Sequence, residues 1–341
     1  MRLLSIIAKF LSSSAVETEA VRNACPVWPA AGKTPPILEV KELAVSFVQY
    51  TGGLRQRNLD VITGLNVTVE PGEIVAVVGS SGSGKSLLAH AILGILPDNA
   101  GVTGSMHYAG EELTPDRQAK LRGREIALIP QAVTFLDPLM RVGAQVRTAV
   151  KNGDAAAAQQ KVFARYQLMP RAGRLFPFQL SGGMARRVLV AGAVVSGARL
   201  VIADEPTPGL HPQVVRETLG HFRELADEGC GVMLITHDIQ TALKVADRIA
   251  VFYAGTTVEI APAADFAGDG ESLRHPYSRA LWRALPQNSF EPITGFQPLP
   301  NALPPGCLFE PRCRWATPRC GMDRPEAREL RGGMVRCVHA A

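Results

Sequence analysis

The sequence contains 341 residues, of which 46% are hydrophobic and 20% are charged, and its formal net charge is +5. This composition predicts a soluble globular chain of one or two domains, because its hydrophobic content is enough to build a full core. It excludes a wholly disordered chain. The small positive charge is spread along the sequence, so it is weak support for a nucleic-acid or acidic-lipid partner. The sequence lacks an uninterrupted run of about 18 apolar residues, the length that a membrane-spanning helix needs. Any work at a membrane would therefore require other chains to cross it.

The first 36 residues predict a poorly ordered leader and linker. Met1–Leu11 places apolar residues at helical spacing, with Arg2 and Lys9 between them. A secretion signal is disfavoured because no small-residue cleavage site follows. Three interpretations stay open: an amphipathic helix on a partner or bilayer surface, a disordered leader, and a wrongly assigned start codon. Residues 12–36 are rich in Pro, Ala, Ser and Gly, which is typical of a linker.

From Ile37 onward, short apolar β-rich runs alternate with helical stretches. Runs of this kind suit strands buried on both faces, and their alternation with helices indicates a largely parallel sheet. The runs are Ile74–Val78, Ile126–Ile129, Leu200–Ala203, Val232–Thr236 and Ile249–Tyr253. The predicted fold class is α/β, with residues 37–265 forming the domain.

Two regions depart from this alternation. Residues 135–198 are rich in Ala, Gln, Arg and Leu, which predicts a helical insertion in the domain. Beyond Pro262 the sequence becomes Pro-rich and carries four of the six cysteines. We therefore expect residues 266–341 to form a small C-terminal extension.

A glycine-rich segment follows the first of these strands directly and precedes a predicted helix, Leu87–Leu96. It fits the pattern G-x-x-x-x-G-K-[ST], in which consecutive backbone N–H groups and a helix N-terminus surround phosphate oxygens. The residues are Gly79, Ser80, Ser81, Gly82, Ser83, Gly84, Lys85 and Ser86. Lys85 is predicted to bind the β- and γ-phosphates of ATP, and the Ser86 hydroxyl to ligate Mg²⁺.

A second motif narrows the chemistry. The apolar run from Arg199 ends in Asp204 and Glu205. Alone, such a pair is more often a turn or a helix cap. Downstream of a phosphate loop, it presents a carboxylate for Mg²⁺ and an adjacent one for water. We expect Asp204 to hold the metal through water and Glu205 to act as the general base.

About twenty residues before that strand, the chain reads Leu180-Ser181-Gly182-Gly183-Met184. In order and spacing this segment resembles the signature motif of the ABC ATPases, although alone it is an ordinary helix cap. The resemblance implies a phosphate-loop ABC cassette with a RecA-like core and a helical subdomain. It also implies that Ser181, Gly182 and Gly183 close over ATP bound to a second cassette, so that complete sites form only in a dimer.

Three further positions can be matched to this family. Gln131 resembles the glutamine that senses Mg²⁺ and the attacking water, and His237 resembles the switch histidine that contacts the γ-phosphate. Phe47 stands where the family places an aromatic that stacks on adenine. A core strand position is the alternative for Phe47, and Tyr50 competes for the adenine role.

One position departs from the family pattern. His211 stands where the family has an aspartate that links the two sites of the dimer. An imidazole offers no fixed negative acceptor. We therefore expect an asymmetric dimer with a different cassette chain.

The C-terminal extension carries a second resemblance. His275–Leu281 and Leu303–Cys313 are similar to the extension of oligopeptide, dipeptide and nickel importer ATPases. Disulfides are disfavoured in a reducing cytosol, so a metal is the preferred interpretation of the four thiols. A four-iron, four-sulfur cluster, Zn²⁺ and free thiols stay open, and the missing C-x-x-C spacing disfavours zinc. The four residues are Cys307, Cys313, Cys320 and Cys337.

The resemblance implies an importer ATPase at the cytoplasmic face of the inner membrane. Its expected partners are two membrane-spanning permeases, a second ABC ATPase subunit and an extracytoplasmic substrate-binding protein, without nucleic acid. The transported substrate is a peptide, nickel or a metal chelate. A non-transport ABC ATPase acting on nucleic acid or ribosomes is the alternative, and a regulatory module that binds ATP without turnover is disfavoured by Glu205 and His237.

Overall fold

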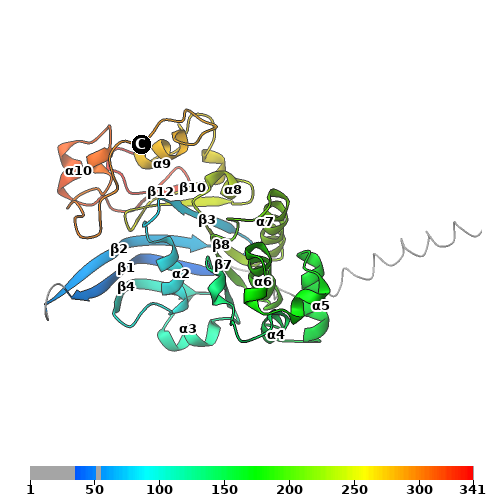
Figure 1. Cartoon of the computed structure of the whole chain (residues 1–341). Helices are drawn as coiled ribbons and strands as arrows, with labels where there is room; N and C mark the ends of the chain where they lie inside the picture. Colours follow the sequence, from blue (N-terminus) through cyan, green and yellow to red (C-terminus); the bar gives the residue numbers. More distant parts are fainter. Residues whose placement is uncertain (1–34, 51–54, 341) are drawn as a thin grey trace, which may run out of the picture.

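The computed structural model describes residues 35–50 and 55–340, so the expectations for the first 34 residues lie outside the described residues. A single mixed sheet organises this part of the chain (Figure 1). Five mutually parallel strands follow one another across the sheet in the order β9, β3, β8, β7, β6. Their bounds are β3 Ile74–Gly79, β6 Ile126–Ile129, β7 Leu200–Asp204, β8 Gly231–Ile235 and β9 Arg248–Tyr253. All five predicted strands and the predicted α/β class are confirmed.

The remaining strands pair mainly antiparallel. Strands β5, β4, β1 and β2 form one edge, and β2 meets β10 through the parallel pair Gly64 and Thr256. Strand β10 also pairs with β12 of the C-terminal extension. The bounds are β1 Leu38–Tyr50, β2 Gln56–Val69, β4 Ala100–Tyr108, β5 Glu111–Glu112, β10 Thr256–Pro262, β11 Arg328–Leu330 and β12 Gly333–Val335. The extension therefore adds strands to the same sheet.

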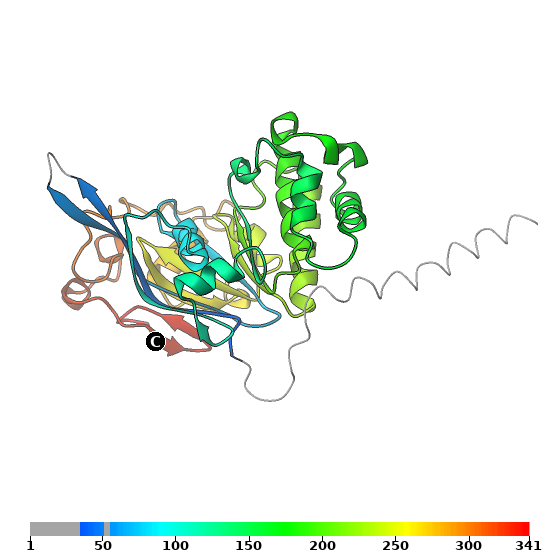
Figure 2. The ribbon, with the colours of Figure 1, turned by 90° about the horizontal axis from the view of Figure 1, so that it is seen from below.

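Helices cover the sheet in separate groups. Helices α4, α5 and α6 gather on one side, apart from the C-terminal extension (Figure 2). They lie inside the range predicted to be a helical insertion. The α-helices are α2 Lys85–Leu93, α3 Pro115–Leu121, α4 Val142–Thr148, α5 Ala155–Arg165, α6 Gly182–Val195, α7 Pro212–Asp227, α8 Ile239–Leu243, α9 Pro276–Arg283 and α10 Pro318–Met322. The short 3₁₀ turns are Val133–Phe135, Pro170–Arg174, Pro177–Gln179, Ala263–Asp265 and Glu310–Arg312.

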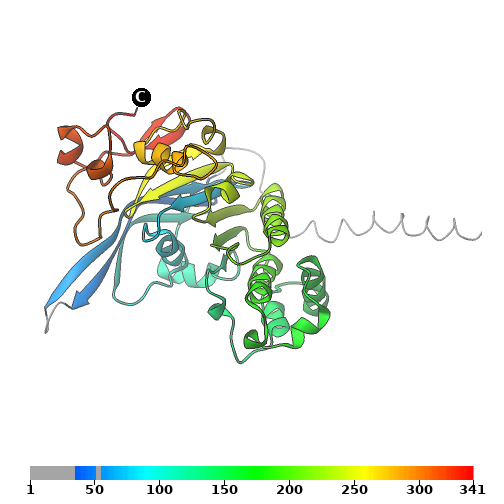
Figure 3. The same cartoon turned by 45° about the horizontal axis from the view of Figure 1, so that its top comes forward.

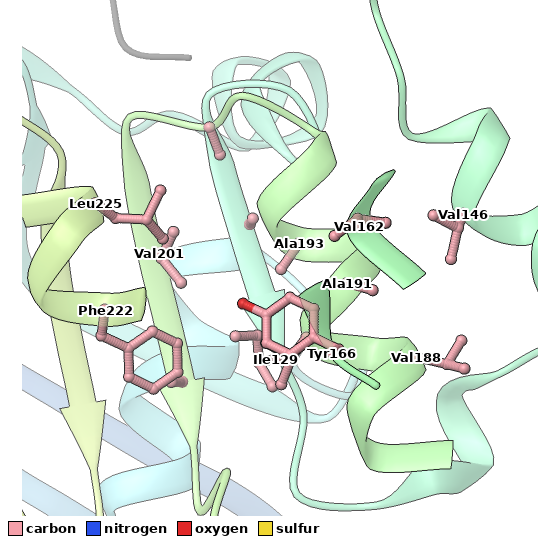
Figure 4. Packing of buried hydrophobic residues seen from close by; sticks show 14 of the residues in the cluster. Ile129, Val146, Val162, Tyr166, Val188, Ala191, Ala193, Val201, Phe222 and Leu225 are labelled. Atoms are coloured by element: carbon pink, nitrogen blue, oxygen red, sulfur yellow. The ribbon is translucent and has the colours of Figure 1, made fainter. Parts of the chain in front are cut away.

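Buried apolar clusters join these groups to the sheet. One cluster unites α6, α7 and the end of α5 with β6 and β7, and Figure 4 shows Val188, Phe222 and Tyr166 contributed by the three helical segments. A second cluster lies between α2 and the strands β1 and β2. A third packs β9 against the C-terminal extension. Burying large apolar side chains contributes about 1.5–3 kcal/mol each, so these clusters hold the helices and the extension against the strands.

A buried ionic network attaches the extension, which Figure 3 shows lying over β10. Glu259 and Arg274 are almost fully buried, and the Glu259 carboxylate accepts from the backbone N–H groups of Arg274 and His275 at 2.8 and 2.9 Å. The Arg274 guanidinium reaches Asp265 at 2.8 Å and the Leu330 carbonyl at 2.7 Å. Removing one member of such a network leaves an unpaired buried charge, which is strongly destabilising. Each member is therefore needed to hold the extension on the sheet.

Candidate nucleotide site

The phosphate loop, residues 79–86, connects β3 to α2 as the sequence predicts. Gly84 has a φ of 96°, a left-handed conformation that favours glycine. A Cβ on Gly79 would lie 2.3 Å from the Phe252 carbonyl oxygen, so this position also requires glycine. The Lys85 ammonium donates to the carbonyl oxygens of Gly79 and Ser80 at 2.9 and 3.0 Å. These bonds hold Lys85 inside the loop, at the start of a helix.

A cavity of about 320 Å³ opens beside this loop. It brings together Lys85 and Ser86 with Gln131, Asp204, Glu205 and His237, which come from four separate segments. Ser81, Gly82 and Gly84 complete the loop side of the wall, together with Val61 and Leu87, which sequence reasoning missed. Of the other predicted loop residues, Gly79, Ser80 and Ser83 do not line the described cavity. Val61 carries no sequence signal, because β2 reaches the cavity only through sheet pairing.

The acidic pair at the end of β7 is buried. The Asp204 Oδ1 and Glu205 Oε2 atoms have no hydrogen-bond partner among the described residues. Burial raises the pKa of Asp204, while a hydrogen bond from the Ser86 hydroxyl opposes that rise. Burial lowers the pKa of Lys85, and the nearby carboxylates of Glu205 and Asp204 oppose that change. Unpartnered carboxylate oxygens beside a hydroxyl are the donors that Mg²⁺ prefers, so this set fits the metal.

Glu205 is held in a specific orientation. Its φ of 48° is unusual for a residue with a side chain, and its N–H donates to the Ile235 carbonyl at 2.9 Å. The Oε1 atom accepts from the His237 backbone N–H at 3.0 Å and lies 2.8 Å from the His237 Nδ1 atom. Backbone strain of about 1–3 kcal/mol is typical of residues positioned for function.

Arg186 on α6 joins the site and was missed by sequence reasoning. Its guanidinium donates to the Glu205 carbonyl oxygen and, at 3.0 Å, to the Gln131 carbonyl oxygen. One arginine therefore bridges two cavity residues from different segments. Arg186 lies three residues after Gly183 in a helix, and only the folded arrangement of α6 beside β7 reveals this contact.

The signature residues lie at the start of α6. The Ser181 hydroxyl caps this helix by accepting from the Met184 N–H at 3.3 Å. Of the described residues that line the cavity, none is Ser181, Gly182 or Gly183. A site shared with a second chain fits this placement, although the shared site stays a prediction.

The adenine position also stays a prediction. Phe47 lies on β1 opposite Leu59, half-buried against the cluster around α2, and it is not among the described cavity residues. Tyr50 is 66% exposed, and its hydroxyl accepts from the Gln56 side chain at 2.9 Å. Phe47 and Tyr50, the two candidates for stacking on adenine, therefore lie on the same strand, and neither lines the described cavity.

His211 has an identifiable local role. It precedes α7, and its Nδ1 atom accepts from the Gln213 backbone N–H at 3.4 Å. The imidazole thus serves as the N-cap of α7, a position where aspartate is also favoured. The substitution therefore keeps an acceptor and removes a negative charge.

The four cysteines of the extension converge on one small pocket. Cys307, Cys313, Cys320 and Cys337 line it together with His275 and His339, and none of the four is in a disulfide. Burial raises the pKa of Cys307 to about 11. Within the described residues, no group of three or more His, Cys, Asp or Glu side chains has an arrangement that could hold a metal ion. The fold therefore gathers the four free thiols at one place.

Comparisons with known proteins decide the family. The oligopeptide transport ATP-binding protein OppD of Mycobacterium tuberculosis is 36% identical over 85% of this chain and 50% of that protein. The dipeptide transport ATP-binding protein DppD of Haemophilus influenzae is 33% identical over 88% of this chain and 94% of that protein. This chain belongs to the ABC transporter ATP-binding family. It spans about half the length of the mycobacterial relative.

Family models agree with this membership. The ABC transporter model matches residues 62–208, and the model of the oligopeptide/dipeptide transporter C-terminal region matches residues 258–320. The cassette fold is shared with solved structures. CbiO1 of Clostridium perfringens covers 68% of this chain at 25% identity with a TM-score of 0.54, and a cassette dimer bound to ADP and phosphate covers 66% at 23% identity with a TM-score of 0.58. Among the described helices, none has both the length and the apolar character needed to cross a bilayer.

Proposed function

We propose that this ABC cassette hydrolyses ATP and thereby powers peptide import through partner membrane proteins. The Glu205–His237 pair beside the unpartnered Asp204 carboxylate oxygen supports hydrolysis. The relatives named for oligopeptide and dipeptide transport and the match over residues 258–320 support the peptide class over nickel. Their names give no support to the alternative of action on nucleic acid or ribosomes.

Six side chains of the cavity have a role in this proposal: Lys85, Ser86, Gln131, Asp204, Glu205 and His237. Lys85 and the loop N–H groups bind the phosphates of ATP, and Ser86, Gln131 and Asp204 hold Mg²⁺. When bound, Mg²⁺ supplies positive charge that stabilises the phosphate oxygens. Glu205 accepts the proton of the attacking water, and its contact with His237 through Oε1 leaves Oε2 as the unpartnered acceptor.

His237 has a second role, as a contact of the γ-phosphate of ATP. Arg186 orients Glu205 and Gln131 by donating to their backbone carbonyl oxygens. Ser181 to Gly183 of a second cassette complete the site, and the adenine stacks on Phe47. In this arrangement His237 holds one carboxylate oxygen of Glu205, and the other, unpartnered oxygen accepts the proton.

The proposed assembly contains two permeases, an external binding protein and a second, different cassette chain, with this chain at the cytoplasmic membrane face. His211 supports unlike partners, because it removes the negative charge expected at the position that links two sites. Purification of this chain alone as an active symmetric dimer would contradict that composition.

Uptake in a strain that lacks its own peptide importers tests the function. Cells that carry the whole transporter should accumulate a labelled di- or oligopeptide, and Lys85→Ala in this chain should abolish uptake. Lys161→Ala on α5, away from the phosphate loop, is the matched control. Uptake of nickel in place of peptide would reassign the substrate, and uptake that survives Lys85→Ala would contradict the ATP-driven role.

We also propose that the four gathered thiols ligate a four-iron, four-sulfur cluster. Four thiolates are a suitable donor set for the cluster, with Zn²⁺ as the alternative. The four thiols line one pocket, which supports a shared ligand. Protein purified without oxygen should contain iron and acid-labile sulfide in equal amounts and absorb visible light. Stoichiometric zinc, or neither metal, would overturn the cluster.

A further inference from the structure

Ser80, the second residue of the phosphate loop, is contacted by two side chains of the C-terminal extension. Its hydroxyl donates to the Oε1 atom of Gln297, which lies 217 positions further along the chain. Tyr277 interacts with both the side chain and the backbone of Ser80. These contacts join the extension to the nucleotide site, although neither residue belongs to a nucleotide-binding motif.

Tyr277 is rigidly held. It lies in the first turn of α9, where its N–H donates to the His275 Nδ1 atom at 3.0 Å. Its ring is 4.4 Å from that of Tyr253 and 5.3 Å from that of Phe309, measured between centroids. Burial raises the pKa of Tyr277, and its hydrogen bonds with the side chain and backbone of Ser80 oppose that rise.

Gln297 is anchored through its own segment. Arg312 donates to the carbonyl oxygens of Thr294 at 2.8 Å and Ile293 at 3.1 Å. The same guanidinium reaches the Tyr253 hydroxyl at 3.2 Å, so it links the segment before Gln297 to the aromatic cluster around Tyr277. A Cβ on Gly82 would lie 4.0 Å from the Gln297 Nε2 atom, which places this amide against the loop.

Ser80 therefore connects the extension to Lys85, the residue proposed to bind phosphate. Its hydroxyl is engaged by the extension, while its carbonyl oxygen accepts from Lys85. The next residues, Ser81 and Gly82, are exposed, so the loop has little other support there. We propose that Tyr277 and Gln297 are positioning residues that hold Ser80 and keep the loop N–H groups directed at the nucleotide phosphates. This inference rests on the proposed nucleotide role of the loop.

Nucleotide affinity of the full chain tests the proposal. Gln297→Met and Tyr277→Phe remove the hydrogen-bonding groups and retain size, and each should weaken MgADP binding roughly two- to tenfold, the value of one or two hydrogen bonds. Phe296→Ala, at a side chain 95% exposed beside Gln297, and Tyr166→Phe, whose buried hydroxyl has no partner among the described residues, are matched controls that should bind within twofold of the parent. Binding by both test variants within twofold of the parent would overturn the proposal.

A double-mutant cycle separates positioning from general destabilisation. In a Ser80→Ala background the hydroxyl contact is already lost, so Gln297→Met should cause no further loss of MgADP affinity. An undiminished loss in that background would show that Gln297 acts elsewhere and would overturn its role. Lys85→Ala separates failure of the proposed nucleotide role from failure of the positioning role. If Lys85→Ala binds MgADP normally, the nucleotide role of the loop is wrong. If Lys85→Ala loses binding while Gln297→Met and Tyr277→Phe bind normally, only the positioning role is wrong.

Discussion

The Oε1 atom of Glu205 lies 2.8 Å from His237 Nδ1 and also accepts from the His237 backbone N–H at 3.0 Å. One carboxylate oxygen is thus occupied by His237, while Oε2 is buried without a partner in the described part of the chain. In the proposed mechanism this unpartnered oxygen accepts the proton of the attacking water. A general base needs this combination of fixed orientation and an open acceptor.

Glu205→Gln keeps the side-chain shape and removes the basic oxygen. Phosphate release by the assembled transporter should fall about 10²- to 10⁴-fold, the usual contribution of a general base, while MgATP stays bound. Glu329→Gln, on the exposed β11, controls for loss of a carboxylate. Unchanged turnover in Glu205→Gln would place the base at another residue.

Arg186→Lys keeps the charge and removes the planar fork that reaches two carbonyl oxygens. Losing about one hydrogen bond at each of Glu205 and Gln131 should lower kcat roughly tenfold, with a smaller change in the KM for ATP. Steady-state phosphate release measures both constants. The exposed Arg216 on α7 provides the matched Arg→Lys control, and a change confined to KM would contradict an orienting role for Arg186.

His211→Asp should stabilise the chain by about 0.5 kcal/mol, because a carboxylate is a better N-cap and interacts favourably with the positive end of α7. His211→Ala should instead cost about 0.5–2 kcal/mol, because it removes the acceptor for the Gln213 N–H. Urea unfolding midpoints at neutral pH measure both changes. Equal stability of the Asp and Ala variants would show that the cap contributes nothing.

His221 makes stability depend on pH. Burial, with a smaller contribution from Arg165, lowers its pKa from 6.5 to about 4. The unfolded chain therefore binds this proton more readily, so the contribution is fully present above about pH 6.5 and is lost as the pH falls toward 4. We expect a loss of about 1–2 kcal/mol, less than full linkage because the ring is partly accessible.

His221→Phe should flatten this part of the stability curve. The phenyl ring keeps the edge-on contact with Tyr166, whose ring centroid is 4.6 Å from that of His221. Urea unfolding between pH 7 and 4 measures the difference from the parent chain. His107→Phe on β4 is the histidine control, and parallel curves for the parent and His221→Phe would contradict the assignment.

Much of the nucleotide site follows from the sequence, because its determinants are local. The glycines of residues 79–86, the strand before them and the helix after them predict the loop, since each acts within a few residues of its own position. The acidic end of β7 and the signature before α6 are also local patterns. The five parallel strands follow from apolar runs that must be buried on both faces.

Only the tertiary structure places Arg186, Gln297 and Tyr277 at the site. Each acts through a contact with a residue distant in sequence: Arg186 with Gln131, and the other two with Ser80. Such contacts form because the strand order and the buried clusters bring distant segments together. A local sequence pattern does not predict them. The sequence alone predicted which residues carry the chemistry of ATP, whereas the packing of α6 beside β7 and of the C-terminal extension against β9 decided which distant side chains contact them.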